Sequence, residues 1–86
     1  CEGIYSMSGQ CAPLSRMSSL VQNKETMMFV DEAHSFGILG HQGRGAVDEH
    51  HLTQNEVPLR TIAFGKAIAF QGALVAGQKD WVQALL

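Results

Sequence analysis

The sequence lacks the features that mark several specialised classes of protein. It has only two cysteines, Cys1 and Cys11, which are too few for a disulfide framework. It has no apolar run near the ~18–20 residues that a transmembrane helix needs. Its net charge is −2 and its six basic residues are scattered singly, which excludes a basic surface for nucleic acid or an anionic membrane. We therefore expect neither nucleic acid nor a membrane as a partner, and the unpaired thiols favour a cytoplasmic location.

What the sequence does contain is a high proportion of apolar residues for its size. Hydrophobic residues make up 45% of the 86 positions and charged residues 16%, which excludes a disordered tail. A domain of this length would bury only about 60–65% of its unfolded surface and would be marginally stable alone. The chain also begins at Cys1 rather than at a methionine. We therefore expect residues 1–86 to be part of one larger domain, excised from a longer protein.

The alternation of apolar and polar segments predicts an α/β fold. We expect strands at residues 3–6, 27–30, 59–64 and 72–77, and helices at residues 12–21, 45–52 and 79–86. The first helix should bury one stripe of residues at helical spacing: Leu14, Met17, Leu20 and Val21. Residues 27–30 are apolar at every position, which is typical of a parallel strand covered on both faces. The order of the elements predicts a mostly parallel sheet with flanking helices.

Polar side chains stand where the predicted strands end and mark a candidate site. They are Ser6, Asp31 with His34, and Lys66. Ligands of open α/β sheets bind outside the carboxyl ends of the strands. A lysine in a partly desolvated pocket there is held as the neutral amine that Schiff-base formation needs. A carboxylate at the end of the neighbouring strand would keep a pyridoxal ring nitrogen protonated, so Asp31 and Lys66 together predict a pyridoxal site.

Four short motifs occur in order along the chain. They are E-x-x-x-S-M-x-G-x-x-A-P-L at residues 2–14, V-D-E-A-H at 30–34, G-x-x-G-x-x-G-R-G at 37–45 and F-G-K-A at 64–67. Their combination, at these intervals, resembles the α-oxoamine synthases. That family consists of pyridoxal-phosphate (PLP) enzymes with the fold of aspartate aminotransferase. The resemblance implies that residues 1–86 are part of the large domain of a fold-type-I PLP-dependent transferase.

The resemblance also implies roles for individual residues. Lys66 would bind PLP covalently and later act as the base that removes the α-proton of the substrate. Asp31 would pair with the pyridinium nitrogen of the cofactor. His34 and Ser6 would hydrogen-bond the phenolic oxygen of the ring. Glu2 matches a family position near the substrate.

The reaction implied by the resemblance is a decarboxylative condensation of an amino acid with an acyl thioester. The thioester would be carried by coenzyme A or an acyl carrier protein, and the enzyme would be a homodimer. One position departs from the family pattern: Ala63 stands where a threonine or serine usually contacts the cofactor phosphate. The lost hydrogen bond to a charged group is worth roughly 1.5–3 kcal/mol, unless Thr61 or a neighbouring subunit supplies one instead.

A helicase is a weaker interpretation of the same residues. Asp31-Glu32-Ala33-His34 after an apolar strand also matches the Walker B segment of a helicase class. That class needs a G-x-x-x-x-G-K-[ST] loop. Gly65-Lys66 is followed by Ala67, and Arg60 stands where the loop needs its first glycine. The loop is therefore missing from this chain.

Two further alternatives concern metal binding and the absence of activity. The adjacent His50 and His51 would point apart on a helix, so we expect no metal site. The upstream residue that would stack on the pyridine ring and the arginine that would bind the substrate carboxylate have no counterpart here. We therefore expect the chain alone to be inactive, and a non-catalytic α/β piece remains the competing hypothesis.

Overall fold

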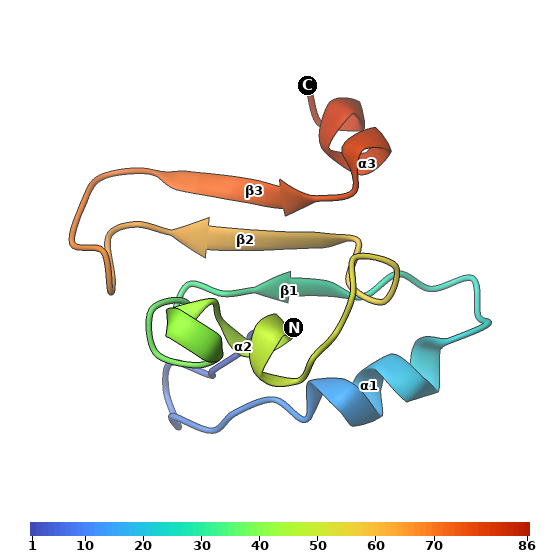
Figure 1. Ribbon diagram of the computed structural model, residues 1–86, viewed down its shortest axis with the longest axis horizontal. Coiled ribbons are helices and arrows are strands. Elements are labelled where there is room, and N and C mark those ends of the chain that lie inside the picture. The colour runs from blue at the N-terminus through green and yellow to red at the C-terminus, as the bar shows by residue number, and fades with distance from the viewer.

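A computed structural model describes residues 1–86 and contains a three-stranded sheet. The strands are β1 (Phe29–Asp31), β2 (Leu59–Ala63) and β3 (Ala73–Gly77), in that order across the sheet. The helices are α1 (Leu14–Val21), α2 (Ala46–Glu49) and α3 (Lys79–Ala84), with a 3₁₀ turn, η1, at His41–Gly43. Figure 1 shows α1 and α2 on the β1 side of the molecule and α3 beside β3 at the opposite edge.

The pairing of the strands is parallel on one side of β2 and antiparallel on the other. β1 pairs in parallel with β2, with Asp31 opposite Thr61, and β3 runs antiparallel to β2. Residues 1–3 extend the parallel part beyond β1, because the Gly3 N–H donates to the Asp31 carbonyl and the Asp31 N–H donates to the Cys1 carbonyl, each at 2.8 Å. The predicted α/β class is therefore confirmed, with β3 as the antiparallel strand of a mixed sheet.

The hydrophobic core lies between β1 and the helices α1 and α2. Its buried members are Ala12, Leu14, Met28, Val30, Ala46, Val47 and Val57. The helix α1 faces this core through positions 14, 17, 18 and 21, which follow the i, i+3, i+4, i+7 spacing of one helical face. The prediction that Leu20 belongs to the buried stripe is wrong. Leu20 is 70% exposed because it lies outside that face, and Ser18 occupies the buried position instead.

The predicted burial of both faces of the first strand is also wrong for this chain. Val30 is fully buried at 0% exposure, whereas Met27 and Phe29 are each 41% exposed. Alternate side chains of a strand point to opposite faces. The face of Val30 packs on the core, and the face of Phe29 remains open.

Several predicted boundaries are too long. The helix predicted at 45–52 ends at Glu49, and His51 beyond it has a positive φ of 53°. The helix predicted at 79–86 ends at Ala84, and residues 3–6 form only an isolated bridge between Ile4 and Cys11 in place of a strand. No helix of the chain is both long enough and apolar enough to span a bilayer.

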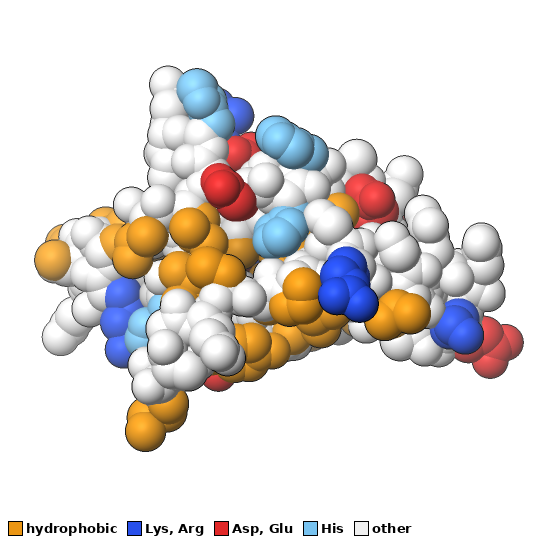
Figure 2. Space-filling model, turned by 90° about the horizontal axis from the view of Figure 1, so that it is seen from below, with side chains coloured by type: hydrophobic (Ala, Val, Ile, Leu, Met, Phe, Trp, Pro, Cys, Tyr) orange, Lys and Arg blue, Asp and Glu red, His pale blue; other side chains and the backbone are white.

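Much apolar surface is exposed. Figure 2 shows hydrophobic side chains exposed at several places on the face seen from below. The exposed large hydrophobic residues include Phe29, Ile68, Phe70, Leu74, Val75 and Trp81. The accessible surface of the chain is 5864 Å², against roughly 5,000 Å² expected for a compact monomer of this mass. The fold therefore presents apolar faces that the chain itself does not cover.

Candidate functional site

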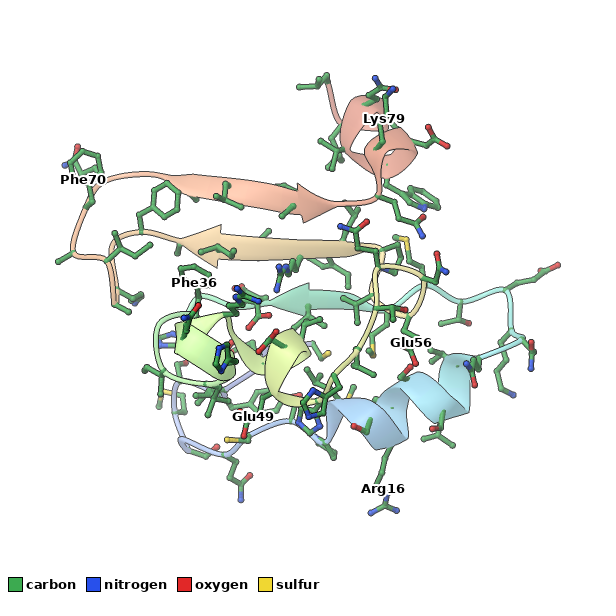
Figure 3. All side chains as sticks on the ribbon, viewed as in Figure 1. Arg16, Phe36, Glu49, Glu56, Phe70 and Lys79 are labelled. Carbon is green, nitrogen blue, oxygen red and sulfur yellow. The ribbon has the colours of Figure 1, made fainter.

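The candidate site lies at the carboxyl ends of β1 and β2. Asp31 is the last residue of β1 and pairs with Thr61, so the two strands end at the same edge of the sheet. β2 ends at Ala63, and Lys66 lies in the turn that follows. In Figure 3, Phe36 in the segment after β1 and Phe70 in the β2–β3 connection mark this edge. The topology thus places the end of β1 and the turn after β2 at one edge of the sheet.

Asp31 has a carboxylate with spare hydrogen-bonding capacity. The side chain is half-buried and lies on the face of β1 opposite Val30. Its Oδ1 accepts a hydrogen bond from the Ala33 N–H at 2.8 Å, and its Oδ2 has no partner in the chain. No basic side chain forms an ion pair with Asp31, since the one salt bridge of the chain joins Arg60 to Glu32. The carboxylate is therefore available to a cationic group of a ligand.

Lys66 lies in an exposed turn. The turn is closed by the Ala69 N–H, which donates to the Lys66 carbonyl at 3.1 Å, and by the Phe70 N–H, which donates to the Phe64 carbonyl at 2.9 Å. The Lys66 amine makes no ion pair in the chain. The expected partial desolvation of this lysine is not seen, because its side chain is exposed.

The other predicted site residues differ in whether their side chains form hydrogen bonds within the chain. The His34 ring is half-buried and has no hydrogen-bond partner, and the exposed Ser6 hydroxyl also has none. Glu2 is half-buried and its Oε2 accepts a hydrogen bond from the Ser6 N–H at 3.3 Å. Glu2 pairs with Asp31 through a parallel bridge, which brings the segment that leads to Ser6 beside the end of β1.

The glycine-rich segment at residues 37–45 packs against the turn of Lys66. The Gly37 N–H donates to the Gly43 carbonyl at 2.7 Å, which closes the loop. A Cβ on Gly37 would lie 2.6 Å from the Cβ of Ala67, so only a residue without a side chain allows this approach. The loop therefore supports the residue next to Lys66.

The chain does not enclose the candidate site. Its surface has two hollows of about 350 and 230 Å³, and neither is lined by Asp31, His34 or Lys66. No group of three His, Cys, Asp or Glu side chains is arranged to hold a metal ion. His50 instead has its Nδ1 3.0 Å from the Ser15 hydroxyl. The two cysteines are free and exposed.

Sequence reasoning missed the buried carboxylate of Glu32. Glu32 belongs to the V-D-E-A-H motif and to the Walker B alternative, and neither pattern gave it a structural role, whereas its side chain is 0% exposed. Its Oε2 accepts a hydrogen bond from the Ala46 N–H at 2.7 Å and its Oε1 one from the Val47 N–H at 3.2 Å. A signal was available, because alternation after Val30 places Glu32 on the core face, where a carboxylate needs partners. The identity of those partners was not predictable from local sequence.

The free groups at this edge fit PLP. A carboxylate without a basic partner suits a pyridinium nitrogen, a free amine suits the aldehyde, and an imidazole and a hydroxyl suit the phenolic oxygen. Ala63 offers no hydroxyl for the phosphate, as noted from the sequence. Thr61 lies two residues earlier on the same face of β2 and is half-buried.

The whole chain matches a known family model. The model for aminotransferase class I and II matches residues 1–86. The 8-amino-7-oxononanoate synthase of Xanthomonas campestris pv. campestris (strain B100) is 40% identical over 84 residues, which are 98% of this chain and 21% of that protein. The enzyme of the same name from Hydrogenovibrio crunogenus is 39% identical over 85 residues, or 99% of this chain and 21% of that protein. The chain thus spans about a fifth of the length of these relatives.

Solved structures resemble the chain over the same extent. The 8-amino-7-oxononanoate synthase of Francisella tularensis superposes with a TM-score of 0.90 at 33% identity, covering 98% of this chain and 24% of that one. A serine palmitoyltransferase from S. paucimobilis, with a bound PLP–myriocin aldimine, superposes with a TM-score of 0.86 at 32% identity, covering 98% and 21%. PLP is thus a component of this neighbouring structure.

Proposed function

Because the chain belongs to the aminotransferase class I and II family, we propose that it is part of a PLP-dependent acyltransferase similar to 8-amino-7-oxononanoate synthase. The fold is that of the fold-type-I PLP enzymes. The observation that carries the proposal is the parallel pairing of β1 with β2, which brings the Asp31 carboxylate and the turn of Lys66 to one sheet edge. The proposed reaction is the decarboxylative condensation of an amino acid with an acyl thioester.

The residues of the site have distinct parts in this proposal. PLP, when bound, supplies an electron sink for the negative charge that develops on the substrate α-carbon. Lys66 would hold the cofactor through Nζ and, once the substrate amine has displaced that nitrogen, would accept the proton from that carbon as a free amine. Asp31 would hold the proton on the ring nitrogen, and its carboxylate has an oxygen free to do so. His34 and Ser6 donate hydrogen bonds to the phenolic oxygen, and Glu2 lies on the substrate side.

For the substrates we propose L-alanine and a pimeloyl thioester of coenzyme A or acyl carrier protein, which places the enzyme in biotin biosynthesis. Support comes from the 8-amino-7-oxononanoate synthases that match 98% of the chain. The siblings glycine C-acetyltransferase, 5-aminolevulinate synthase and serine palmitoyltransferase are the alternatives. Serine palmitoyltransferase is the second candidate, because several of its structures superpose with TM-scores of 0.85–0.86 at 32–33% identity.

We also propose that these 86 residues belong to the PLP-binding large domain and are inactive by themselves. The exposed Lys66 turn and the uncovered apolar faces support this, since a PLP site must exclude water to control its chemistry. In the complete protein we propose a cytoplasmic homodimer. A non-catalytic α/β piece is the competing possibility.

The test is to incubate the complete protein that contains this chain with PLP, reduce it with borohydride and map the label by mass spectrometry. The chain has three lysines, Lys24, Lys66 and Lys79, so two serve as internal controls. We expect the label on Lys66 and not on Lys24 or Lys79, which lie away from the site edge. Absence of label from Lys66 would contradict the proposal. Turnover of L-alanine and pimeloyl thioester by residues 1–86 alone would contradict their proposed inactivity.

A further inference from the structure

The buried carboxylate of Glu32 accepts hydrogen bonds from more groups than any other side chain of the chain. Glu32 follows Asp31 directly and is 0% exposed. Four groups donate to its carboxylate: the Ala46 N–H at 2.7 Å, the Val47 N–H at 3.2 Å, the Ser35 hydroxyl, and the Arg60 guanidinium in an ion pair at 3.5 Å. A buried carboxylate with this many donors is held in one orientation.

These contacts join three elements at the end of β1. The Ala46 and Val47 amides begin α2, so Glu32 caps that helix, and Arg60 lies within β2. The Glu32 N–H also donates to the Thr61 carbonyl at 2.8 Å, which continues the pairing of β1 with β2 past Asp31. Gly45 makes room for the carboxylate, because a Cβ there would lie 2.6 Å from the Glu32 Cδ.

The side chain of Glu32 lies on the opposite face of the strand from the candidate PLP site. Neighbouring residues of an extended chain point to opposite faces, so Glu32 points into the core and Asp31 points away from it. Glu32 therefore acts on the site only through the backbone. Its backbone is continuous with that of Asp31, whose amide and carbonyl are held by Cys1 and Gly3.

We propose that Glu32 is a positioning residue, whose buried carboxylate fixes the end of β1 and thereby aims the Asp31 carboxylate at the cofactor. The proposal rests on the proposed function for the identity of the cofactor. Its structural part, that Glu32 fixes the backbone at the end of β1, is independent of the cofactor.

The variant for the test is Glu32→Gln in the complete protein, with Glu49→Gln as the matched control. Glutamine keeps the size of the side chain but removes the charge and one of the two acceptor oxygens, so it cannot satisfy all four donors. Glu49 lies in α2 and accepts a hydrogen bond from the Gly40 N–H at 2.8 Å, but it is exposed. Figure 3 shows Glu49 on the side of α2 away from the sheet, so its substitution leaves the end of β1 unchanged.

The first measurement is amide hydrogen exchange without PLP. We expect Glu32→Gln to speed exchange at Ala46 and Val47, because glutamine leaves one acceptor oxygen for these two amides, and also at Gly3 and Asp31. Glu49→Gln should leave Gly3 and Asp31 unchanged. If the effect of Glu32→Gln stops at Ala46 and Val47, the residue only caps α2 and the proposal is overturned.

The second measurement is the binding and spectrum of PLP. We expect Glu32→Gln to weaken PLP binding by about tenfold, which is the lower end of the loss seen when a residue that orients a metal ligand is replaced. It should also shift the pH dependence of the visible absorbance of the bound cofactor, because Asp31 no longer holds the ring proton as firmly. Wild-type affinity and an unchanged pH profile in Glu32→Gln would overturn the proposal.

The two proposals fail in distinguishable ways. If wild-type protein does not attach PLP to Lys66, the proposed function fails, while the exchange at Gly3 and Asp31 still reports on Glu32. Should Glu32→Gln not fold, Arg60→Met removes one of the four donors and leaves the other three. We expect the same changes from it at smaller size, and their absence counts against the proposal.

Discussion

At the scale of single residues, two adjacent carboxylates lie in opposite environments. Asp31 is half-buried with one oxygen unpartnered, and Glu32 is fully buried with four donors. The cause is the two-residue period of the strand, which sends one side chain to each face. In the proposed enzyme the first carboxylate contacts the cofactor and the second holds the first in place.

A residue-scale prediction concerns Ala63, where the family usually has threonine or serine. Ala63→Thr adds a hydroxyl at the end of β2, on the same face as Asp31. We expect PLP to bind roughly 10- to 100-fold more tightly, since a hydrogen bond to a charged group is worth about 1.5–3 kcal/mol. The dissociation constant of PLP, measured by absorbance titration of the complete protein, checks this.

The matched control for that prediction is Ala76→Thr. Ala76 is also half-buried in the sheet but lies opposite Arg60 in β3, toward the other end of β2. Its substitution should leave PLP affinity within about twofold, because no phosphate contact is added. Equal effects of the two variants would show that the hydroxyl at position 63 does not reach the phosphate.

At the scale of elements, the short helix α2 depends on a contact that is distant in sequence. It has only four residues, which is too short to be stable by helix propensity. Its first amides are satisfied by the Glu32 carboxylate rather than by a local capping side chain. The loop before it is shaped around that carboxylate, so α2 and the end of β1 form one structural unit.

The element-scale prediction is that Gly45→Ala destabilises this unit. Gly45 has φ 104° and ψ −179°, a region that only glycine readily adopts, and an added Cβ would collide with the Glu32 carboxylate. We expect the free energy of unfolding of the complete protein, from urea titration, to fall by about 3 kcal/mol or more.

Gly9→Ala is the control for this effect. Gly9 also has a positive φ of 71°, but nothing lies within 4 Å of an added Cβ. It should cost only about 1–2 kcal/mol, the penalty for the left-handed backbone. A loss for Gly45→Ala no larger than that for Gly9→Ala would mean that the loop can move away from Glu32.

At the scale of the whole molecule, the sheet is covered by helices on one face of β1 and largely open elsewhere. Only 15 of the 86 residues are buried, and β3 has no buried residue. Apolar surface of this extent normally marks an interface. In the proposed large domain, the remaining chain covers it.

The whole-molecule prediction is that residues 1–86, prepared alone, bind the dye ANS and self-associate, whereas the complete protein binds little dye. The physical reason is the exposed apolar set that includes Phe29, Phe70 and Trp81. Sedimentation at increasing concentration and dye fluorescence provide the measurements. A monomeric chain that does not bind the dye would contradict the interpretation of these faces as internal surfaces.

The sequence by itself determined the order of the helices and strands from residue 12 onward, and the positions of Asp31 at the end of one strand and Lys66 just after the next. Both follow from local patterns, the apolar runs and the short motifs, whose meaning does not depend on distant residues. Only the tertiary structure decided that Leu20, the face of Phe29 and the side chain of Lys66 are exposed. It alone also showed that Glu32 is buried and binds the first amides of α2 and the guanidinium of Arg60. The contacts of Glu32 join segments that lie 14 to 28 positions apart in the sequence, and local propensity carries no record of such contacts.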